Sequence, residues 1–546
     1  MATTTGETFD YVIVGGGSAG CLLAARLGEE KKASVCLLEA GPADKNLFIH
    51  IPAGFIKVIF DPKVTWSFET EPGPSIKGRK LPMLQGRVLG GSGSINGMVY
   101  TRGQAEDFDS WAALGNPGWS YNEVLPYFKR SEHRIDGGDD RYRGRSGGLK
   151  TLELNWPNKL SDAFLEAAMR QGIPANPDYN GPKQEGVGRY QYTIDNGKRC
   201  SAARAFLRDA IRDHAVDLRT DAQVTSVLFD GTVATGVRYK RTGASELYEV
   251  RARREVILCA GAANTPKLLQ ISGVGPAELL KSIGVRVVRD LPGVGANLQD
   301  HYTPRFLFRA KPGVATINGY ARGLPLAGQV LNWMLGKPSI IGIGVVLGFA
   351  YTKSRPELDR PDILITFTPG SFKAGFLGVL DDVPGMTCGV WQLRPESRGY
   401  VKARSADATV APAIQPNYLA ADADQQVVVT ALKLARRIMS GPDIAKYCES
   451  EMLPGTPMNN DEDWLEFARS QGLSGYHICG TARMGLVTDA NAVVDSQLRV
   501  HGLQRLRVVD ASVMPTITSG NTNAATMMIA EKAADMILGR PSPGPV

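Results

Sequence analysis

The chain has 546 residues, 43% hydrophobic and 21% charged, which is long enough to bury more than one hydrophobic core. Its formal net charge of +7 is spread along the sequence without a block of Lys and Arg, so the composition argues against a nucleic-acid-binding protein. The seven cysteines are dispersed and form no C-x-x-C pair, which argues against a disulfide framework or a metal site.

Two further features bear on where the protein works. The N-terminal residues MATTTGETFD have neither the basic start nor the apolar core of a secretory signal, so we predict a cytoplasmic protein. The most apolar stretch, residues 339–351, is only 13 residues long, too short to cross a bilayer. We therefore expect no membrane span.

The first ordered segment is expected at Phe9–Gly20, with the sequence FDYVIVGGGSAG. Its residues 11–14 form a continuous apolar run that is typical of a buried parallel strand. The run ends in three glycines, and Gly15, Gly17 and Gly20 have the spacing G-x-G-x-x-G. Apolar residues at helical spacing follow, so this stretch predicts a strand, a tight turn and a helix.

Each glycine has a physical role in binding a dinucleotide. Gly15 permits the tight turn, Gly17 lets the backbone approach a pyrophosphate, and Gly20 allows close packing of helix on strand. A second apolar run ends at Glu39, 19 residues after Gly20, where a carboxylate can accept hydrogen bonds from a ribose and disfavours the 2′-phosphate of NADP. The alternative is a glycine-rich turn that merely connects strand and helix.

Residues 78–103 are unusually rich in glycine and small polar residues. Four glycines fall within eight positions, and Ser94, Asn96 and Gly97 follow them. Apolar residues such as Val88 and Ile95 are interspersed, which a solvated loop would not need. We interpret this stretch as backbone wrapped around a flat ligand rather than a flexible surface loop. Further along the chain, the apolar spacing of residues 427–439 predicts a helix.

Five blocks of this sequence resemble, in order, those of the glucose–methanol–choline (GMC) flavoprotein oxidoreductases. The first is the glycine-rich fingerprint above, and the second is GRVLGGSGSINGMVYTRG at residues 86–103. The others are GAANTPKLLQISGVGP at 261–276 with VGANLQDH at 294–301, YHICGTARMG at 476–485, and VVDASVMPTITSGNTNAATMMIAEKAADMI at 508–537. They are similar to choline dehydrogenase-like and alcohol oxidase-like members that use a His–Asn pair.

The resemblance implies an α/β fold, α+β overall, in two domains. A Rossmann-like FAD-binding domain would comprise residues 1–155, 198–310 and 475–546. A substrate-binding domain on a six-stranded antiparallel sheet would comprise residues 156–197 and 311–474. Carried over position by position, the family's FAD contacts fall on Gly15, Gly17, Glu39, Arg87, Gly91, Asn96, Gly97, Met98, Val224, Asp510 and Ala511. Because Ile95 stands where some members attach FAD through a His, we expect non-covalent FAD.

The resemblance also implies the catalytic residues. His477 matches the family's base, and Asn521 matches its partner, with Asn523 as a rival two residues on. We interpret His301, in the NLQDH block, as structural and near the flavin rather than catalytic. His477 would remove the hydroxyl proton, Asn521 would help to hold the oxygen, and a hydride would pass to the flavin.

The expected substrate is a neutral, apolar primary alcohol, aliphatic or aromatic, which is oxidised to the aldehyde. Val345 occupies the place that we align with the glutamate that holds the ammonium of choline in choline-oxidising relatives. A cationic substrate would lack its counter-charge there, so we disfavour choline and keep a choline dehydrogenase-like activity as the alternative. Three other functions on the same scaffold are alternatives to alcohol oxidation: a hydroxynitrile lyase, a fatty-acid photodecarboxylase and a non-catalytic flavoprotein. The electron acceptor is O2 or a quinone- or dye-like molecule. The sequence decides neither oxidase against dehydrogenase nor the oligomeric state.

Overall fold

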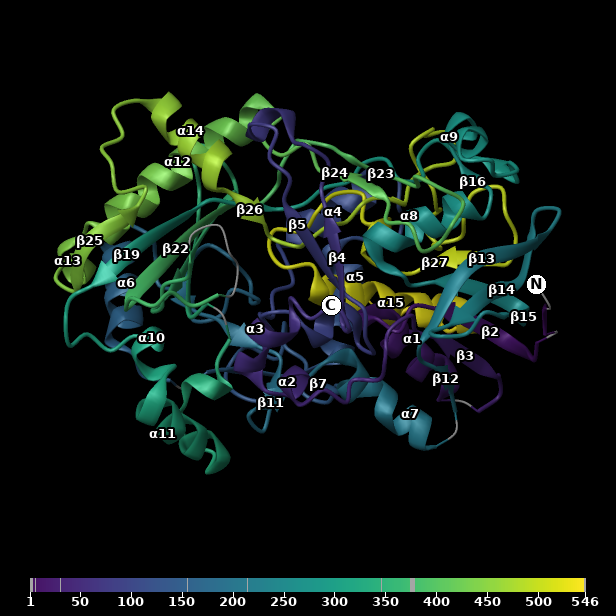
Figure 1. Ribbon diagram of the computed structural model, residues 1–546, viewed down its shortest axis with the longest axis horizontal. Helices are drawn as coiled ribbons and strands as arrows, with labels where there is room; N and C mark the ends of the chain where they lie inside the picture. The colour runs from purple at the N-terminus through teal and green to yellow at the C-terminus, as the bar shows by residue number, and fades with distance from the viewer. Residues whose placement is uncertain are drawn as a thin grey trace.

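The computed structural model describes residues 1–546 except residues 1, 2, 5, 30, 155, 214, 345, 374–378, 545 and 546. The expectation based on Val345 therefore lies outside the described residues. Two sheets organise the rest, and they lie side by side along the long axis of the molecule (Figure 1). The N-terminus and the C-terminal helix α15 (Asn523–Leu538) both belong to the part that surrounds the first sheet.

The first sheet contains the predicted nucleotide-binding strands. Strands β12 (Asp217–Arg219), β3 (Val35–Leu38), β2 (Thr8–Val14) and β15 (Leu247–Leu258) run parallel in that order, and β27 (Leu506–Val508) pairs with the end of β15. An antiparallel hairpin of β14 (Val233–Arg241) and β13 (Ala222–Asp230) extends the sheet beyond β15. Helix α1 (Ser18–Gly28) contacts β2 and β3 and packs on α15, and α15 in turn contacts α5 (Tyr121–Ser131). Strands covered on both faces are uniformly apolar, as β3 is.

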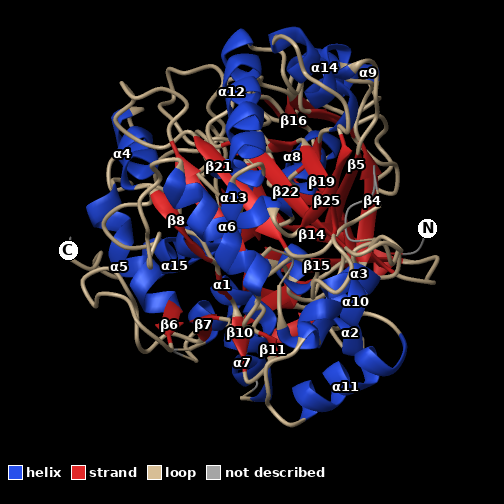
Figure 2. Ribbon diagram, turned by 90° about the vertical axis from the view of Figure 1, so that its left-hand side faces the viewer, coloured by secondary structure: helices blue, strands red, loops and turns tan. Residues whose placement is uncertain are grey.

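The second sheet has six antiparallel strands in the order β25 (Cys448–Leu453), β19 (Arg305–Ala310), β22 (Gly385–Gln392), β21 (Ile363–Thr368), β20 (Gly348–Thr352) and β8 (Gly186–Arg189). Helix α12 (Asp422–Met439) contacts β21 and β22, while α6 (Lys159–Arg170) contacts β20 and β8 (Figure 2). Helix α14 (Asp461–Gln471) packs on α12. The helix predicted over residues 427–439 is confirmed and begins five residues earlier.

One domain boundary differs from the sequence-based expectation. Strand β19 lies in the second sheet, whereas residues 198–310 were expected in the FAD-binding domain. Phe306 and Phe308 of β19 are buried in the hydrophobic core of the second sheet, because the strand pairs with β22 on one side and β25 on the other. The boundary therefore falls before Arg305.

Short strand pairs connect the two parts. Strand β18 (Tyr302–Thr303) pairs with β26 (Leu473–Ser474), and β4 (Thr65–Glu69) pairs with β5 (Pro82–Gly86). The pairing of β18 with β26 brings His301 and His477 together, since each residue lies within three positions of the paired strands. Helix α8 (Gly261–Ile271) follows β15 and contacts β13.

The remaining elements are short or peripheral. The helices are α2 (Leu47–His50), α3 (Phe55–Val58), α4 (Ala105–Ala113), α7 (Arg208–Arg212), α9 (Ala277–Ser282), α10 (Ile317–Tyr320), α11 (Gly323–Met334) and α13 (Pro442–Ala445). The strands are β1 (Thr3–Thr4), β6 (Glu132–Arg134), β7 (Leu149–Glu153), β9 (Gln191–Tyr192), β10 (Ile194–Asp195), β11 (Lys198–Arg199), β16 (Val274–Gly275), β17 (Arg289–Asp290), β23 (Tyr400–Lys402) and β24 (Ala413–Gln415).

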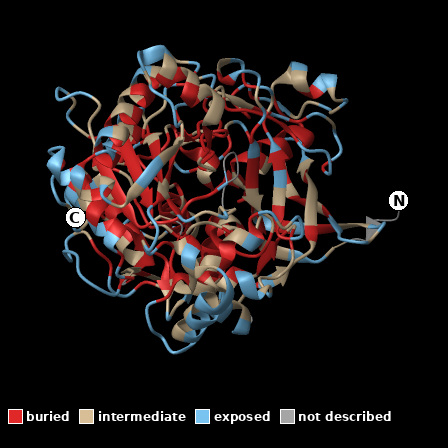
Figure 3. Ribbon diagram, turned by 60° about the vertical axis from the view of Figure 1, so that its left-hand side comes forward, coloured by how far each residue is buried: buried red, intermediate tan, exposed pale blue. Residues whose placement is uncertain are grey.

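Burial follows the two sheets, with exposed residues concentrated in outer loops and helices (Figure 3). Each sheet has its own large hydrophobic core. All seven cysteines are free thiols. Among the described residues, no helix combines the length and the apolar character needed to cross a bilayer.

Candidate active site

The turn between β2 and α1 has the geometry that its glycines predict. Gly15 has φ +104°, and a Cβ there would lie 2.4 Å from the carbonyl oxygen of Cys259. A Cβ on Gly20 would lie 1.9 Å from the oxygen of Gly15, so any side chain would push α1 away from the strand. Gly17 is the N-cap of α1 without a side-chain cap. The first amides of α1 therefore remain available to an anion, with the helix dipole behind them.

Glu39 lies buried just after β3, where the backbone holds its carboxylate. Its Oε2 accepts a hydrogen bond from the amide of Gly16 and its Oε1 one from the amide of Gly41, each at 2.8 Å. Burial raises the pKa of Glu39 to about 7, although these two amides and the charge of Arg87 oppose the rise. Each oxygen keeps a second lone pair, which suits a hydroxyl ligand.

The glycine-rich loop lies directly against this turn. Gly91 has φ +56°, and a Cβ there would stand 2.7 Å from the Cα of Gly17. The loop is held by Asn96, whose Oδ1 accepts hydrogen bonds from the amide of Met98 at 3.0 Å and from Nη1 of Arg199 at 2.7 Å. Met98 itself has φ +63°, a conformation that costs free energy in a non-glycine residue and is common at functional sites.

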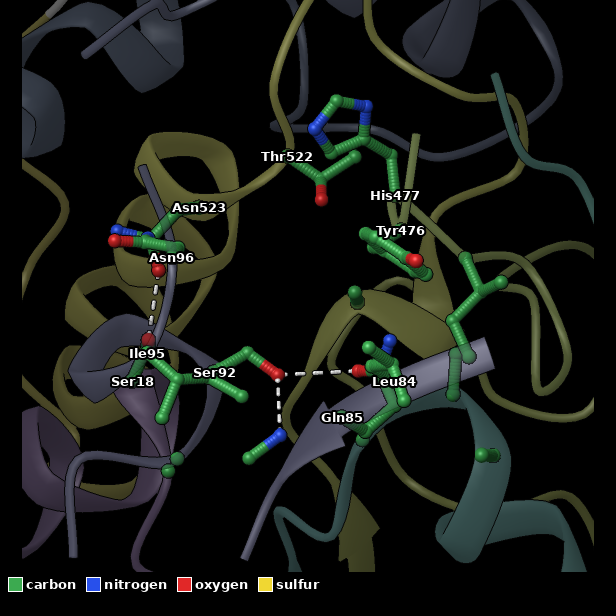
Figure 4. A pocket seen from close by; sticks show the side chains of 18 of the residues that line it. Ser18, Leu84, Gln85, Ser92, Ile95, Asn96, Tyr476, His477, Thr522 and Asn523 are labelled. Carbon is green, nitrogen blue, oxygen red and sulfur yellow. Dashed lines mark hydrogen bonds between the residues drawn. The ribbon is translucent and has the colours of Figure 1, made fainter. Parts of the chain in front are cut away.

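These elements enclose a cavity of about 360 Å³ between the two sheets. The predicted cofactor contacts that line it are Gly15, Gly17, Glu39, Gly91, Asn96, Gly97, Met98, Val224, Asp510 and Ala511. Gly20 and Arg87 do not line it: Gly20 packs α1 on the strand, and the Arg87 guanidinium lies 4.8 Å from the ring centre of Trp66. His477 and Asn521 line the same cavity, and Figure 4 shows His477 and Tyr476 on a segment across from Ser92 and Gln85.

The cradle fits a dinucleotide such as FAD. Glycine backbone and helix amides meet at one place, the Glu39 carboxylate lies beside them, and a Cβ on Gly91 would close the gap. The carboxylate of Asp510 is hydrogen-bonded within the protein. It accepts from the amide of Gly261 at 2.9 Å and from the hydroxyl of Thr265 at 2.6 Å. Burial raises the pKa of Asp510. Its side chain therefore helps to fix the backbone at Ala511.

Two imidazoles and one amide form a hydrogen-bonded chain at the other end of the cavity. Nε2 of His301 lies 2.9 Å from the carbonyl oxygen of Leu393, Nδ1 of His301 lies 3.0 Å from Nδ1 of His477, and Nε2 of His477 lies 2.8 Å from Nδ2 of Asn521. A carbonyl only accepts, so Nε2 of His301 carries its proton and Nδ1 of His301 accepts. Nδ1 of His477 then donates, which leaves the Nε2 lone pair of His477 toward Asn521.

The surroundings keep His477 neutral and fixed. Burial lowers the pKa of His477 well below its usual range, and the neighbouring His301 adds to the effect. The His477 amide donates to Oδ1 of Asp300 at 2.7 Å, and Ser474 donates to Oδ2 of Asp300 at 2.6 Å. The ring of Trp391 lies 5.0 Å from that of His477. The sequence analysis missed Asp300 and Trp391; the place of Asp300 beside His301 in the NLQDH block was the available signal.

The two candidate asparagines face different partners. Asn521 contacts His477, whereas Oδ1 of Asn523, the first residue of α15, accepts a hydrogen bond from the hydroxyl of Ser18 at 2.7 Å (Figure 4). Ser18 begins α1, so Asn523 lies at the nucleotide end of the cavity. The structure thus brings His477 together with Asn521 and His301, and it separates Asn523 from them.

Comparison with known proteins agrees with this architecture. The N-terminal domain of the GMC oxidoreductases matches residues 9–303, and their C-terminal domain matches residues 395–530. The chain is 40% identical to the alcohol dehydrogenase [acceptor] of Pseudomonas putida over 97% of this chain and 96% of the relative. It is also 40% identical to the mitochondrial choline dehydrogenase of Homo sapiens, over 98% of this chain and 91% of the relative.

Solved structures show the same fold. Pyridoxine 4-oxidase from Mesorbium loti superposes with a TM-score of 0.88 and 31% identity, covering 97% of this chain and 99% of that one. Formate oxidase from Aspergillus oryzae RIB40, in a variant made to study FAD modification, superposes with a TM-score of 0.91 and 25% identity, covering 98% of this chain and 99% of that one. With both domains matched in order along the sequence, the chain belongs to the GMC oxidoreductase family.

Proposed function

We propose that this protein oxidises the CH–OH group of an alcohol with bound FAD. The observation that carries the proposal is the neutral His477, whose Nε2 lone pair faces Asn521 in the cavity that the glycine cradle adjoins. Relatives named alcohol dehydrogenase, choline dehydrogenase and pyridoxine 4-oxidase support the reaction class. FAD, when bound, supplies the acceptor for the hydride that leaves the alcohol carbon.

The residues of this chain would handle the hydroxyl proton and the oxygen. Nε2 of His477 takes the proton, since burial keeps that imidazole unprotonated at neutral pH. Nδ1 of His477 keeps its own proton and donates it in a hydrogen bond to His301, so the His477 ring does not turn when it becomes charged. The amide of Asn521 then donates to the substrate oxygen and stabilises the charge that develops there.

The cradle would hold FAD without a covalent bond. The amides at the start of α1 would hold the diphosphate beside Gly15 and Gly17, and Glu39 would hold the ribose through its free lone pairs. The loop from Gly91 to Met98 would support the flavin ring, with Val224 and Ala511 as further lining residues. Ile95 lines the cavity with a side chain that cannot form a covalent link, which supports non-covalent FAD.

Charge on the cavity wall supports an alcohol without a cationic group. The described carboxylates that line the cavity, Glu39 and Asp510, belong to the nucleotide end, and the described lining residues of the second sheet contribute none. Apolar residues of the wall, such as Phe372 and Trp391, suit an aliphatic or aromatic primary alcohol that becomes an aldehyde. Choline is therefore the less favoured substrate. O2 or a quinone- or dye-like molecule would reoxidise the flavin.

Flavin bleaching tests the reaction. We expect anaerobic addition of benzyl alcohol to bleach the flavin absorbance of the purified protein, and we expect the His477→Ala variant to retain FAD but reduce it about 10²- to 10⁴-fold more slowly. A variant that is reduced at the wild-type rate would show that His477 is not the base. A flavoprotein that no alcohol bleaches would favour the lyase, photodecarboxylase or non-catalytic alternatives. Oxygen uptake compared with anaerobic dye reduction separates oxidase from dehydrogenase.

A further inference from the structure

Arg305, at the start of β19, lines the cavity without a partner for its charge. Among the described residues, its guanidinium forms neither a hydrogen bond nor an ion pair. Burial lowers the pKa of Arg305 only to about 10, so the group is charged at neutral pH. Arg305 is half-buried. A cation that is partly shielded from water without a counter-ion costs free energy, and proteins usually pair it.

The register of the second sheet shows how the wall makes room for this side chain. Arg305 pairs with Gly389 of β22, and Gly389 pairs with Thr366 of β21, so the three residues form one row across the sheet. A Cβ on Gly389 would lie 2.9 Å from Oγ1 of Thr366 and 3.6 Å from Cγ of Arg305. The glycine therefore leaves a shallow slot in which the arginine side chain rests against the wall.

Other polar groups with unused hydrogen-bonding capacity lie beside this slot. Oγ1 of Thr303 is buried without a hydrogen-bond partner among the described residues, and it would lie 3.3 Å from a Cβ on Gly389. Tyr476 also lines the cavity, and its backbone has φ +61°. Tyr476 is the ionisable group that raises the pKa of Arg305. Burial raises the pKa of Tyr476 itself to about 12, so Tyr476 carries no charge at neutral pH. No described acid compensates Arg305.

The slot lies at some distance from the reacting pair. His301, which touches His477, is four residues before Arg305, so the two Cα atoms can be separated by up to about 13 Å at about 3.3 Å per residue. The nucleotide diphosphate is not the missing anion, because its expected position is the start of α1 in the other part of the molecule. The missing acceptor must therefore come from the substrate side of the cavity.

We propose that Arg305 binds a carboxylate at the far end of the substrate, so that the preferred alcohols are hydroxy acids with a terminal CH2OH group. Thr303 and Tyr476 donate the further hydrogen bonds that a carboxylate accepts. The inference rests on the proposed alcohol oxidation and narrows its substrate class. It replaces the wholly neutral substrate expected from the sequence with one whose single negative charge Arg305 neutralises.

Matched substrate pairs test the inference on the FAD-bound enzyme. We expect kcat/KM for 4-(hydroxymethyl)benzoate to exceed that for 4-methylbenzyl alcohol by about 10- to 100-fold, the effect of a charge-assisted hydrogen bond. The pair 6-hydroxyhexanoate and 1-hexanol tests an aliphatic chain. Arg305→Gln should abolish the preference mainly by raising KM for the carboxylates, and Arg305→Lys should restore part of it. The Arg309→Gln variant is the control, since Arg309 lies on the same strand outside the cavity lining.

The outcomes separate this inference from the proposed function. If the neutral alcohols bleach the flavin and the carboxylates show no advantage in the wild type, the role of Arg305 is refuted and alcohol oxidation stands. The role of Arg305 is equally refuted if Arg305→Gln keeps the full preference while its flavin content matches that of the wild type. If neither member of either pair bleaches the flavin, the proposed function itself fails. Binding of 4-methylbenzoate, measured by its perturbation of the flavin spectrum, should weaken in Arg305→Gln about 10-fold or more.

Discussion

The two ends of the cavity are built in different ways. The nucleotide end consists of backbone: glycines whose absent side chains let β2, α1 and the loop at Gly91 approach each other, with Glu39 held by two amides. The end at the second sheet consists of side chains, among them His477, Asn521 and Arg305, which come from three separate parts of the sequence. The backbone end has no room for added side chains, whereas side chains that line a cavity can change one at a time without disturbing the fold.

The difference between the two ends predicts that truncating a side chain near His477 leaves the fold and FAD binding intact but slows the reaction. We expect Asn521→Ala to lower the rate of flavin reduction by about 10²- to 10³-fold while FAD remains bound, because in its proposed role the amide would stabilise charge on the reacting oxygen. Asn523→Ala is the matched control, since Asn523 contacts Ser18 instead of His477. Its main effect should be on FAD retention. Equal rate losses in both variants would contradict the assignment of Asn521, and stopped-flow absorbance measures them.

The backbone end should respond to the smallest added group. In Gly91→Ala, the new Cβ would stand 2.7 Å from the Cα of Gly17 at φ +56°. We expect this overpacking to cost about 1 to 3 kcal/mol and to weaken FAD binding by about 10- to 100-fold. Gly231→Ala is the control, because its φ is also +56° but nothing lies within 4 Å of the added Cβ. Titration of the flavin-depleted variants with FAD gives both affinities, and equal losses would mean that strain rather than contact determines the result.

Burial of His301 predicts a smaller, pH-dependent effect at the side-chain end. Its pKa falls to about 4 in the folded protein, from 6.5 when unfolded, so the folded state binds fewer protons. Stability is then greatest above pH 6.5 and declines as the pH falls toward 4. Between pH 7.5 and 5.5 we expect the wild type to lose about 1 kcal/mol more than His301→Leu, measured by urea denaturation. A parallel decline in both proteins would rule out His301 as the source.

The sequence predicts the backbone end of the cavity better than the side-chain end. The strand, turn and helix around Gly15, Gly17 and Gly20 are local in sequence, and their geometry agrees with the spacing. The contact between His301 and His477 joins residues 176 positions apart and depends on the pairing of β18 with β26. The slot for Arg305 depends on the register of β19 with β22, which no motif encodes. Long-range register therefore limits what sequence alone can predict about specificity.

The carbonyl of Leu393 has a consequence for where protons can travel. It receives the Nε2 hydrogen of His301 but cannot itself take up a proton, so the row of imidazoles is closed at its inner end. A proton gained by His477 has no exit through the protein interior along this row. If His477 is the base, as proposed, the proton that it gains must therefore leave through the cavity that His477 lines.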